Sequence, residues 1–163
     1  MKAQPRKIRR NRRKASEEPA GVTATARLDR KTKSLVNRLC PGDIAIIDHA
    51  DLDLTGADAL IGRQVAAVVN AARSITGRYP NRGPQHLLEA GIPLIDDCGP
   101  EVFDRVKEGQ CVRLDGDTLY AGETVVAKGR LQDAESVASA MAEAKTHIEA
   151  EIESMSPTIS SGR

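Results

Sequence analysis

The stretch over residues 65–97 limits the folds open to this chain more than any other. A β-branched apolar run, residues 65–69, stops at Asn70, and a polar loop with glycines and prolines follows over residues 73–84. A short helix-like segment then leads into a second apolar run, residues 92–95. Two short buried runs joined through a helical segment are typical of a βαβ unit with parallel strands.

Polar residues follow both apolar runs, where a ligand site is expected. A right-handed crossover places the carboxyl ends of both strands on one edge of the sheet, and this edge forms the ligand crevice of open α/β folds. The loop also contains arginines, whose planar guanidinium groups bind phosphate or carboxylate. Pro84 is expected to begin a helix, and the free backbone N–H groups at a helix N-terminus attract anions. We therefore predict a concave anion-accepting site formed by Asn70, Ser74, Gly77, Arg78, Tyr79, Asn81, Gly83 and Asp96.

The acidic pair Asp96 and Asp97 restricts the class of ligand. Two carboxylates repel a simple phosphate unless a cation bridges them. The expected ligand is therefore a sugar- or nucleotide-like molecule, or a partner peptide of mixed charge, and the sequence names no cofactor. The alternative is a structural surface loop, fixed by its glycines and prolines, with its arginines in solvent.

Residues near a second predicted strand end offer a weaker candidate site. His49 stands beside Asp48, Asp51 and Asp53, and clustered carboxylates are ligands for hard divalent cations. We favour the interpretation that these aspartates form turns and helix caps. The sequence has neither a Gly-Lys-Ser/Thr phosphate loop nor a G-x-G-x-x-G motif after a strand, and it indicates no catalytic residues.

The remaining pattern predicts one α/β domain over residues 39–130, preceded by a basic, largely disordered tail over residues 1–38. Leu28, Leu35 and Leu39 are expected to form one face of a short helix where that tail meets the domain. Further predicted elements are a strand at 43–48, a helix at 55–63 with Thr55 as N-cap, a helix at 100–107, and a β meander at 111–114, 118–121 and 124–127.

A long helix is predicted over residues 131–156, with a disordered tail over residues 157–163. Its apolar residues recur at near-heptad steps, and Pro157 is expected to end it. This apolar face either packs on the domain of the same chain, connects to a further domain or pairs in a homodimer. Its members are Val137, Met141, Ala144, Ile148, Ile152 and Met155.

The net charge of +1 hides a division between the two ends of the chain. Residues 1–39 hold 13 Lys and Arg against 3 acidic residues, whereas residues 40–163 hold 11 against 20. The basic segment predicts an anionic partner, either membrane lipid or nucleic acid, although a solvated tail with no fixed partner stays open. Three cysteines without metal spacing, and no apolar stretch of about 20 residues, favour a cytoplasmic protein.

Several sequence motifs of this chain resemble those of two known families. AGIPLID and KEGQCVRLDGDTLYAG resemble the swivelling β/β/α phosphohistidine domain of phosphoenolpyruvate-utilising enzymes. In that family a phosphorylated histidine lies in the glycine-rich loop, at a place that falls near Arg82 here. His86 is a turn too late, so phosphotransfer is not implied.

The closer resemblance is to SteA-like cytokinetic-ring proteins of actinobacteria. It rests on CPGDIAIIDHADLD, on VAAVVNAARSITGRYPNRGP, and on GIPLIDDCGPEVFDRVKEGQCVRLDGDTLY. It covers residues 39–155, and it departs from the family at Arg73, where the family has Pro. The family continues into a thiamine-pyrophosphokinase-like domain, which would lie beyond Arg163.

These resemblances imply a small swivelling-type α/β domain with a long C-terminal helix. The function they imply is a non-catalytic interaction or ligand-sensing module in cell division, with a cell-division protein as partner and a cytoplasmic location, membrane-associated at the septum. The alternatives are the front half of a thiamine-pyrophosphokinase-like enzyme, or a stand-alone domain that binds phosphate or another small molecule.

Overall fold

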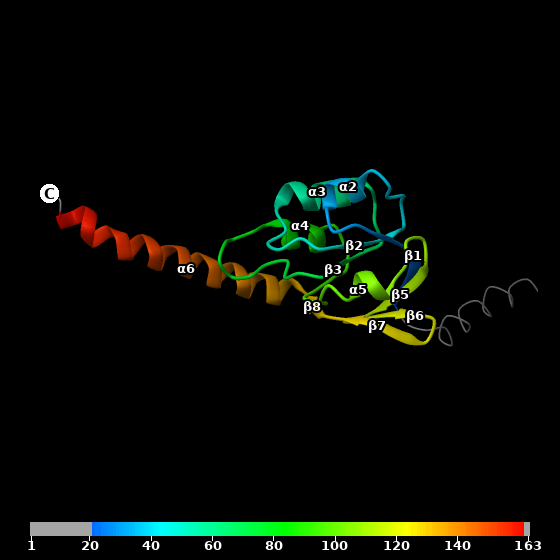
Figure 1. Ribbon diagram of the computed structural model, residues 1–163. Coiled ribbons are helices and arrows are strands. Elements are labelled where there is room, and N and C mark those ends of the chain that lie inside the picture. The colour runs from blue at the N-terminus through cyan, green and yellow to red at the C-terminus, as the bar shows by residue number, and fades with distance from the viewer. Residues whose placement is uncertain (1–20, 162–163) are drawn as a thin grey trace, which may run out of the picture.

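A mixed sheet organises the described part of the chain, which is residues 21–161 of a computed structural model, with side chains described to residue 152. Four neighbouring strands are parallel, and antiparallel strands flank them in the order β7-β6-β5-β1-β2-β3-β4-β8 (Figure 1). The strands are β1 (Val22–Leu28), β2 (Ile44–Ile47), β3 (Ala67–Asn70), β4 (Leu94–Asp96), β5 (Cys111–Asp115), β6 (Thr118–Ala121), β7 (Thr124–Lys128) and β8 (Arg130–Gln132). The predicted α/β class, with parallel strands and a meander, is confirmed.

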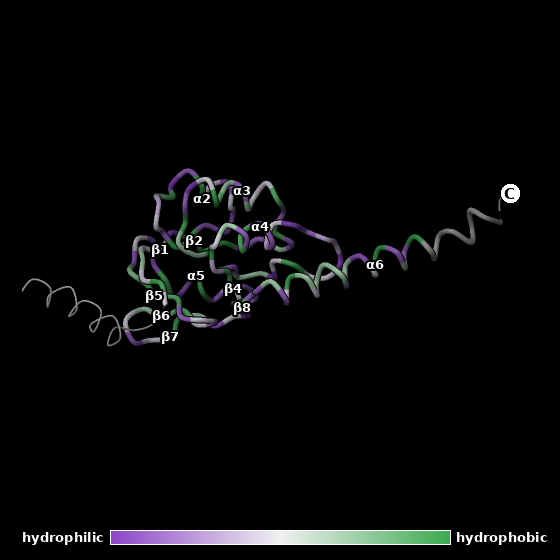
Figure 2. Tube along the Cα trace, turned by 180° about the vertical axis from the view of Figure 1, so that it is seen from behind, coloured by the Kyte–Doolittle hydropathy of each residue, from purple (hydrophilic) through white to green (hydrophobic). Residues whose placement is uncertain are grey.

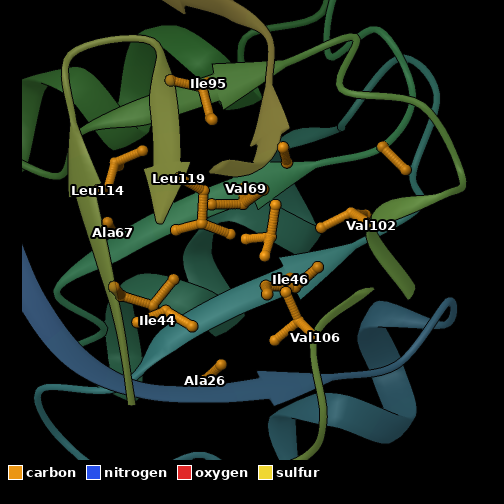
Figure 3. Close-up of a cluster of buried hydrophobic side chains, with 14 residues drawn as sticks. Ala26, Ile44, Ile46, Ala67, Val69, Ile95, Val102, Val106, Leu114 and Leu119 are labelled. Carbon is orange, nitrogen blue, oxygen red and sulfur yellow. The ribbon is translucent and has the colours of Figure 1, made fainter. Parts of the chain in front are cut away.

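Side chains of the parallel strands alternate between two apolar cores, because successive residues of a strand point to opposite faces. Ile44 and Ile46 enter one core, whereas Ala45 and Ile47 enter the other. Helices α2 (Thr32–Val36), α3 (Leu54–Gly62) and α4 (Gly83–Glu89) cover the second core. Strands β5 to β7 and the short α5 (Val102–Arg105) cover the first (Figure 3).

The antiparallel strands fold back over the parallel sheet and give the molecule β/β/α layers. Strand β7 continues through Gly129 into β8, which pairs with β4 at the opposite edge of the sheet. A Cβ atom at Gly129 would collide with the carbonyl oxygen of Asp96, so only glycine fits this crossing. Strand β8 is missing from the sequence prediction, which placed Gln132 in the following helix.

The N-terminal boundary of the domain differs from the prediction. Residues 22–39 were expected to carry a helix within a tail, but β1 lies between β2 and β5. Val22, Ala24, Ala26 and Leu28 alternate toward the first core, a strand pattern that was overlooked. The domain therefore includes β1 and does not begin at residue 39. Residues 1–20, where the basic tail was predicted, lie outside the described residues.

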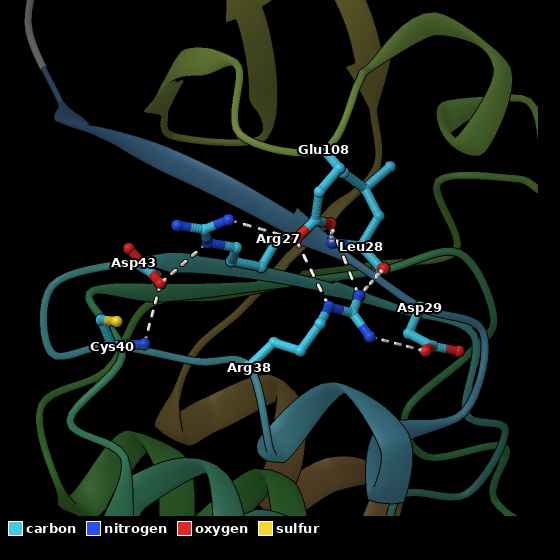
Figure 4. A network of polar contacts seen from close by, with 7 residues as sticks. All are labelled: Arg27, Leu28, Asp29, Arg38, Cys40, Asp43 and Glu108. Carbon is cyan, nitrogen blue, oxygen red and sulfur yellow. Dashed lines mark hydrogen bonds and ion pairs between the residues drawn. The ribbon is translucent and has the colours of Figure 1, made fainter.

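A charged network fixes β1 to the segments on both of its sides (Figure 4). Glu108 accepts hydrogen bonds from Leu28 N at 2.9 Å and from Arg27 Nη1 at 3.3 Å, and it pairs with Arg38 Nε at 3.4 Å. Arg38 also pairs with Asp29 at 3.1 Å. Although partial burial opposes ionisation of Glu108, the bonds from Leu28, Arg38 and Arg27 lower its pKa below the usual value.

The last element is α6 (Ala134–Ser161), a helix of 28 residues, or about 42 Å. Asp133 and Ser136 cap its start reciprocally: Ser136 N donates to Asp133 Oδ1 at 2.7 Å, and Asp133 N donates to Ser136 Oγ at 2.8 Å. Its first half packs on the body, where Val137 and Ala144 are buried, and its second half projects outward (Figure 1). The helix runs past Pro157, its predicted end.

Two smaller boundaries also shift. Asp53, not Thr55, is the N-cap of α3, because its carboxylate accepts a hydrogen bond from Gly56 N at 2.9 Å. The helix predicted over residues 100–107 is reduced to the single turn of α5. In the described part of the chain, none of the helices combines the length and the apolar character that crossing a membrane requires.

Candidate functional site

The carboxyl ends of β2, β3 and β4 lie side by side, which places most of the predicted site at one edge of the sheet. Ile47 of β2 is in register with Asn70 of β3, and Val69 of β3 is in register with Ile95 of β4. Asn70 and Asp96 therefore end neighbouring strands, as the sequence predicted.

Asn70 is fully buried and uses its whole amide in the fold. Its Nδ2 donates to His49 O and to Ser74 Oγ, both at 2.9 Å. Its Oδ1 accepts from His49 N and from Ala72 N, both at 3.0 Å. An amide has two donors and two acceptor positions, and all four are occupied here. Asn70 therefore holds the loops after β2 and β3 together.

Asp96 continues this buried network toward α6. Its Oδ2 accepts from Ser74 N at 2.8 Å, and Gln132 Nε2 donates to both carboxylate oxygens at 3.1 Å. Gln132 Oε1 in turn accepts from Ser136 Oγ at 2.8 Å. A buried carboxylate is tolerated only when hydrogen bonds replace water, and these bonds do so. The network joins β3, β4, β8 and the first turn of α6.

The predicted acidic cluster after β2 is divided among separate partners. Asp48 pairs with Arg30 at 3.2 Å, His49 Nδ1 bonds Thr32 Oγ1 at 2.9 Å, and Asp53 caps α3. Asp51 accepts from Thr76 N at 2.9 Å and from Thr76 Oγ1 at 3.0 Å. Within the described residues, no three His, Cys, Asp or Glu side chains are grouped so that they could hold a metal ion.

The tip of the loop presents the remaining predicted residues. Arg78 is exposed and Tyr79 is 55% exposed, so both reach solvent. Gly77 has a φ of +86°, and a Cβ atom there would come within 3.0 Å of Glu143 Oε1 on α6. A Cβ atom at Gly83 would collide with the carbonyl oxygen of Leu52. Gly77 is thus favoured by its backbone conformation, and Gly83 is required by close packing against the backbone.

Asn81 is the one loop residue with an unsatisfied buried atom. Its backbone N donates to Tyr79 O at 2.8 Å, but among the described residues its buried Nδ2 has no hydrogen-bond partner. The eight predicted residues therefore do not all face one cavity. Asn70, Ser74 and Asp96 join in a buried clasp, whereas Arg78 and Tyr79 stand in solvent.

A hollowed surface runs along α6. The sequence predicted the apolar face that contains Val137, Met141 and Ile148, but not the hollows beside it. Two hollows of about 430 Å³ each share Met141 as a wall. The first lies between α4 and α6, and the second lies between Pro80 and the next turns of α6. The first is lined by Gln85, Leu88, Glu89, Ala134, Val137, Ala138 and Met141, and the second by Pro80, Met141, Ala142, Lys145, Ile148 and Glu149. The sequence signal that could have indicated these hollows is the set of alanines at steps of four, Ala134, Ala138 and Ala142, beside the predicted apolar face.

One cysteine lies beside the buried network. Burial, together with the charges of Asp96 and Asp97, raises the pKa of the Cys98 thiol to about 12. The thiol therefore stays protonated at neutral pH, and a protonated thiol is a poor nucleophile. Cys40 and Cys111 are exposed on the surface.

Comparison with known proteins does not assign this chain to a family. No family model matches the sequence, and no curated protein matches it. The resemblance to SteA-like proteins therefore remains a prediction from the sequence motifs described above.

Proposed function

We propose that this chain is a non-catalytic interaction module of a SteA-like cell-division protein, and that the two hollows along α6 form its docking groove. The observation that carries the proposal is this groove, which lies beside a helix that projects well beyond the body (Figure 1). Its floor is apolar, with Leu88, Val137 and Met141, and charged Glu89 and Glu149 stand at its rim. Amphipathic helices bind such grooves through apolar anchors.

The buried network supports a docking function over a catalytic one. The polar groups of Asn70 and Asp96, which a catalytic site at the sheet edge would need, are committed to hydrogen bonds inside the protein. Their bonds fix the start of α6 relative to the sheet. A rigidly held helix presents its apolar face with little loss of entropy on binding.

The test is the location of a fluorescent fusion of the full chain in dividing actinobacterial cells. We expect the wild type to concentrate at the septum and Ala138→Lys, in the groove, to spread through the cell. Ser139→Lys adds the same charge at an exposed position outside both hollows and should stay at the septum. A diffuse wild type would refute the role in division, and a septal Ala138→Lys variant would refute the groove as its docking surface.

A second candidate function, ligand sensing by the loop over residues 77–83, is favoured by Asn81. A buried donor without a partner costs roughly 1–3 kcal/mol, so a bound acceptor would relieve that cost. We expect a nucleotide or sugar phosphate to raise the thermal midpoint of the wild type but not that of Arg78→Ala or Asn81→Ala. If no member of such a panel shifts the wild type, the loop has a structural function only.

A further inference from the structure

The exposed side of α6 carries both small and large apolar residues. One face of the helix presents Ala138, Met141, Ala142, Lys145, Ile148 and Glu149, which we call the seam. Ala138 and Ala142 are small and exposed in the walls of the hollows, whereas Ile148, in the wall of the second hollow beside Pro80, is larger and half-buried. The hollow over Ala142 can accept a large side chain, and Ile148 is such a side chain, six residues further along the same helix.

We propose that the seam binds the seam of a second copy of this chain in an antiparallel pair, with the two-fold axis near Lys145. A two-fold interface must be complementary to itself, so a surface that contains both the projection and its hollow can satisfy it. With the axis at residue 145, Ile148 of each copy lies over Ala142 of the other. This inference rests on the docking function proposed above for the groove, and it names the partner.

The charges of the seam are also complementary in this arrangement. The seam contains one base, Lys145, and one acid, Glu149, so it is neutral although α6 as a whole is acidic. In the antiparallel pair the two Lys145 side chains face each other at the axis. Glu149 of one copy lies opposite Met141 of the other, one turn from Lys145, so each lysine has an opposing carboxylate nearby that offsets the repulsion between the two lysines. Helical side chains lean toward the N-terminus, so Lys145 and the opposing Glu149 lean toward each other. Antiparallel helix dipoles add a small favourable term.

A second copy would stabilise the projecting half of α6 by packing against it. Helices without tertiary packing are marginal in water, and most helical stability in proteins comes from a packed apolar face. The last turns of α6 project beyond the body, and hydrophobic positions continue along the helix (Figure 2). In the proposed pair, the projecting half of each copy lies along the body-proximal half of the other, toward Leu88.

The first experiment measures the mass of the full chain by light scattering. We expect a dimer for the wild type and for Ser139→Lys, and a monomer for Ile148→Lys and Ala142→Lys. Lys145→Glu and Glu149→Lys should each weaken the dimer, and the double variant should restore it, because the reciprocal pairs re-form with exchanged charge. A monomeric wild type, or Ile148→Lys that remains as dimeric as Ser139→Lys, would overturn the inference.

The second experiment tests the antiparallel orientation by disulfide trapping, in a background where Cys40 and Cys111 are replaced by Ser. Lys145→Cys, at the axis, should form a disulfide between copies on oxidation. Ala138→Cys should not, because seven residues from the axis on each side separate the two copies by about 21 Å along the helix. Trapping at both positions would indicate a parallel pair. These results are independent of septal location, so the docking proposal and the dimer can fail separately.

Discussion

Individual polar residues at the sheet edge act in the fold, although the sequence marked them for a ligand. Asn70 was predicted to line a crevice because polar residues after parallel strands commonly do so. The prediction of position is correct, but position alone does not say where a side chain points. Two of the four hydrogen bonds of Asn70 are made to the backbone of His49, which is distant in sequence, and only the folded chain brings these atoms within 3.0 Å.

The buried network predicts a large stability difference between two residues of the predicted site. Asn70→Ala removes four hydrogen bonds and leaves buried partners unsatisfied, so the free energy of unfolding should fall by about 3 kcal/mol. Arg78→Ala should change it by less than about 0.5 kcal/mol, because Arg78 is exposed. Urea unfolding measures both. Equal midpoints for Asn70→Ala and the wild type would show that the network is not a clasp.

At the scale of elements, the apolar patterns predicted the buried strands well and their neighbours less well. Both central runs formed strands because Val68, Val69 and Ile95 face cores on two sides, and continuous apolar runs indicate such burial. Strand β1 was mistaken for a helix because its alternation uses the small residues Ala24 and Ala26. Strand β8 was missed because three residues give no period, and its pairing with β4 is set by tertiary structure.

The position of β1 predicts how truncations will behave. Deletion of residues 1–20 should leave the thermal midpoint close to that of the full chain, because these residues precede the sheet. Deletion of residues 1–38 also removes β1 and α2, exposes the paired edges of β2 and β5, and should abolish cooperative unfolding. Circular dichroism on heating follows both. If the chain without residues 1–38 still unfolds cooperatively, the domain begins at residue 39 and β1 is not required for folding.

The network at Glu108 predicts a dependence of stability on acid. The pKa of Glu108 is lowered in the folded chain, so its contribution is present above the unfolded pKa of about 4.5 and is lost as pH falls through the folded value. Glu108→Gln should lower the free energy of unfolding at pH 7 by at most about 1 kcal/mol, because the pair is partly exposed. The difference between the two proteins should shrink as pH falls through the folded pKa of Glu108, and a difference that stays constant into acid would contradict this account.

At the scale of the whole molecule, the charge of the chain is divided between its ends. The first 20 residues contain eight Lys and Arg and two Glu, whereas residues 40–163 have an excess of acid. The sequence alone shows this division of charge, but it does not predict any contact between the basic segment and the acidic body. An acidic body also repels the anionic surfaces that a basic segment attracts, so the segment would have to hold the body at a distance from such a surface.

We expect the basic segment to bind anionic lipid vesicles independently of the fold. Each Lys or Arg near an acidic surface contributes about 1 kcal/mol, and salt screens this attraction. The full chain should therefore sediment with vesicles that contain phosphatidylserine at low salt, and less so as salt rises. The chain without residues 1–20 should remain in solution, as should both proteins with neutral phosphatidylcholine vesicles.

The Ile148→Lys variant separates the effect of the basic segment from that of the dimer, because it keeps the segment. It should still bind the vesicles, although more weakly, because a dimer carries two segments and gains avidity. Binding that is unchanged by the deletion, or insensitive to salt, would assign membrane attraction to another part of the molecule.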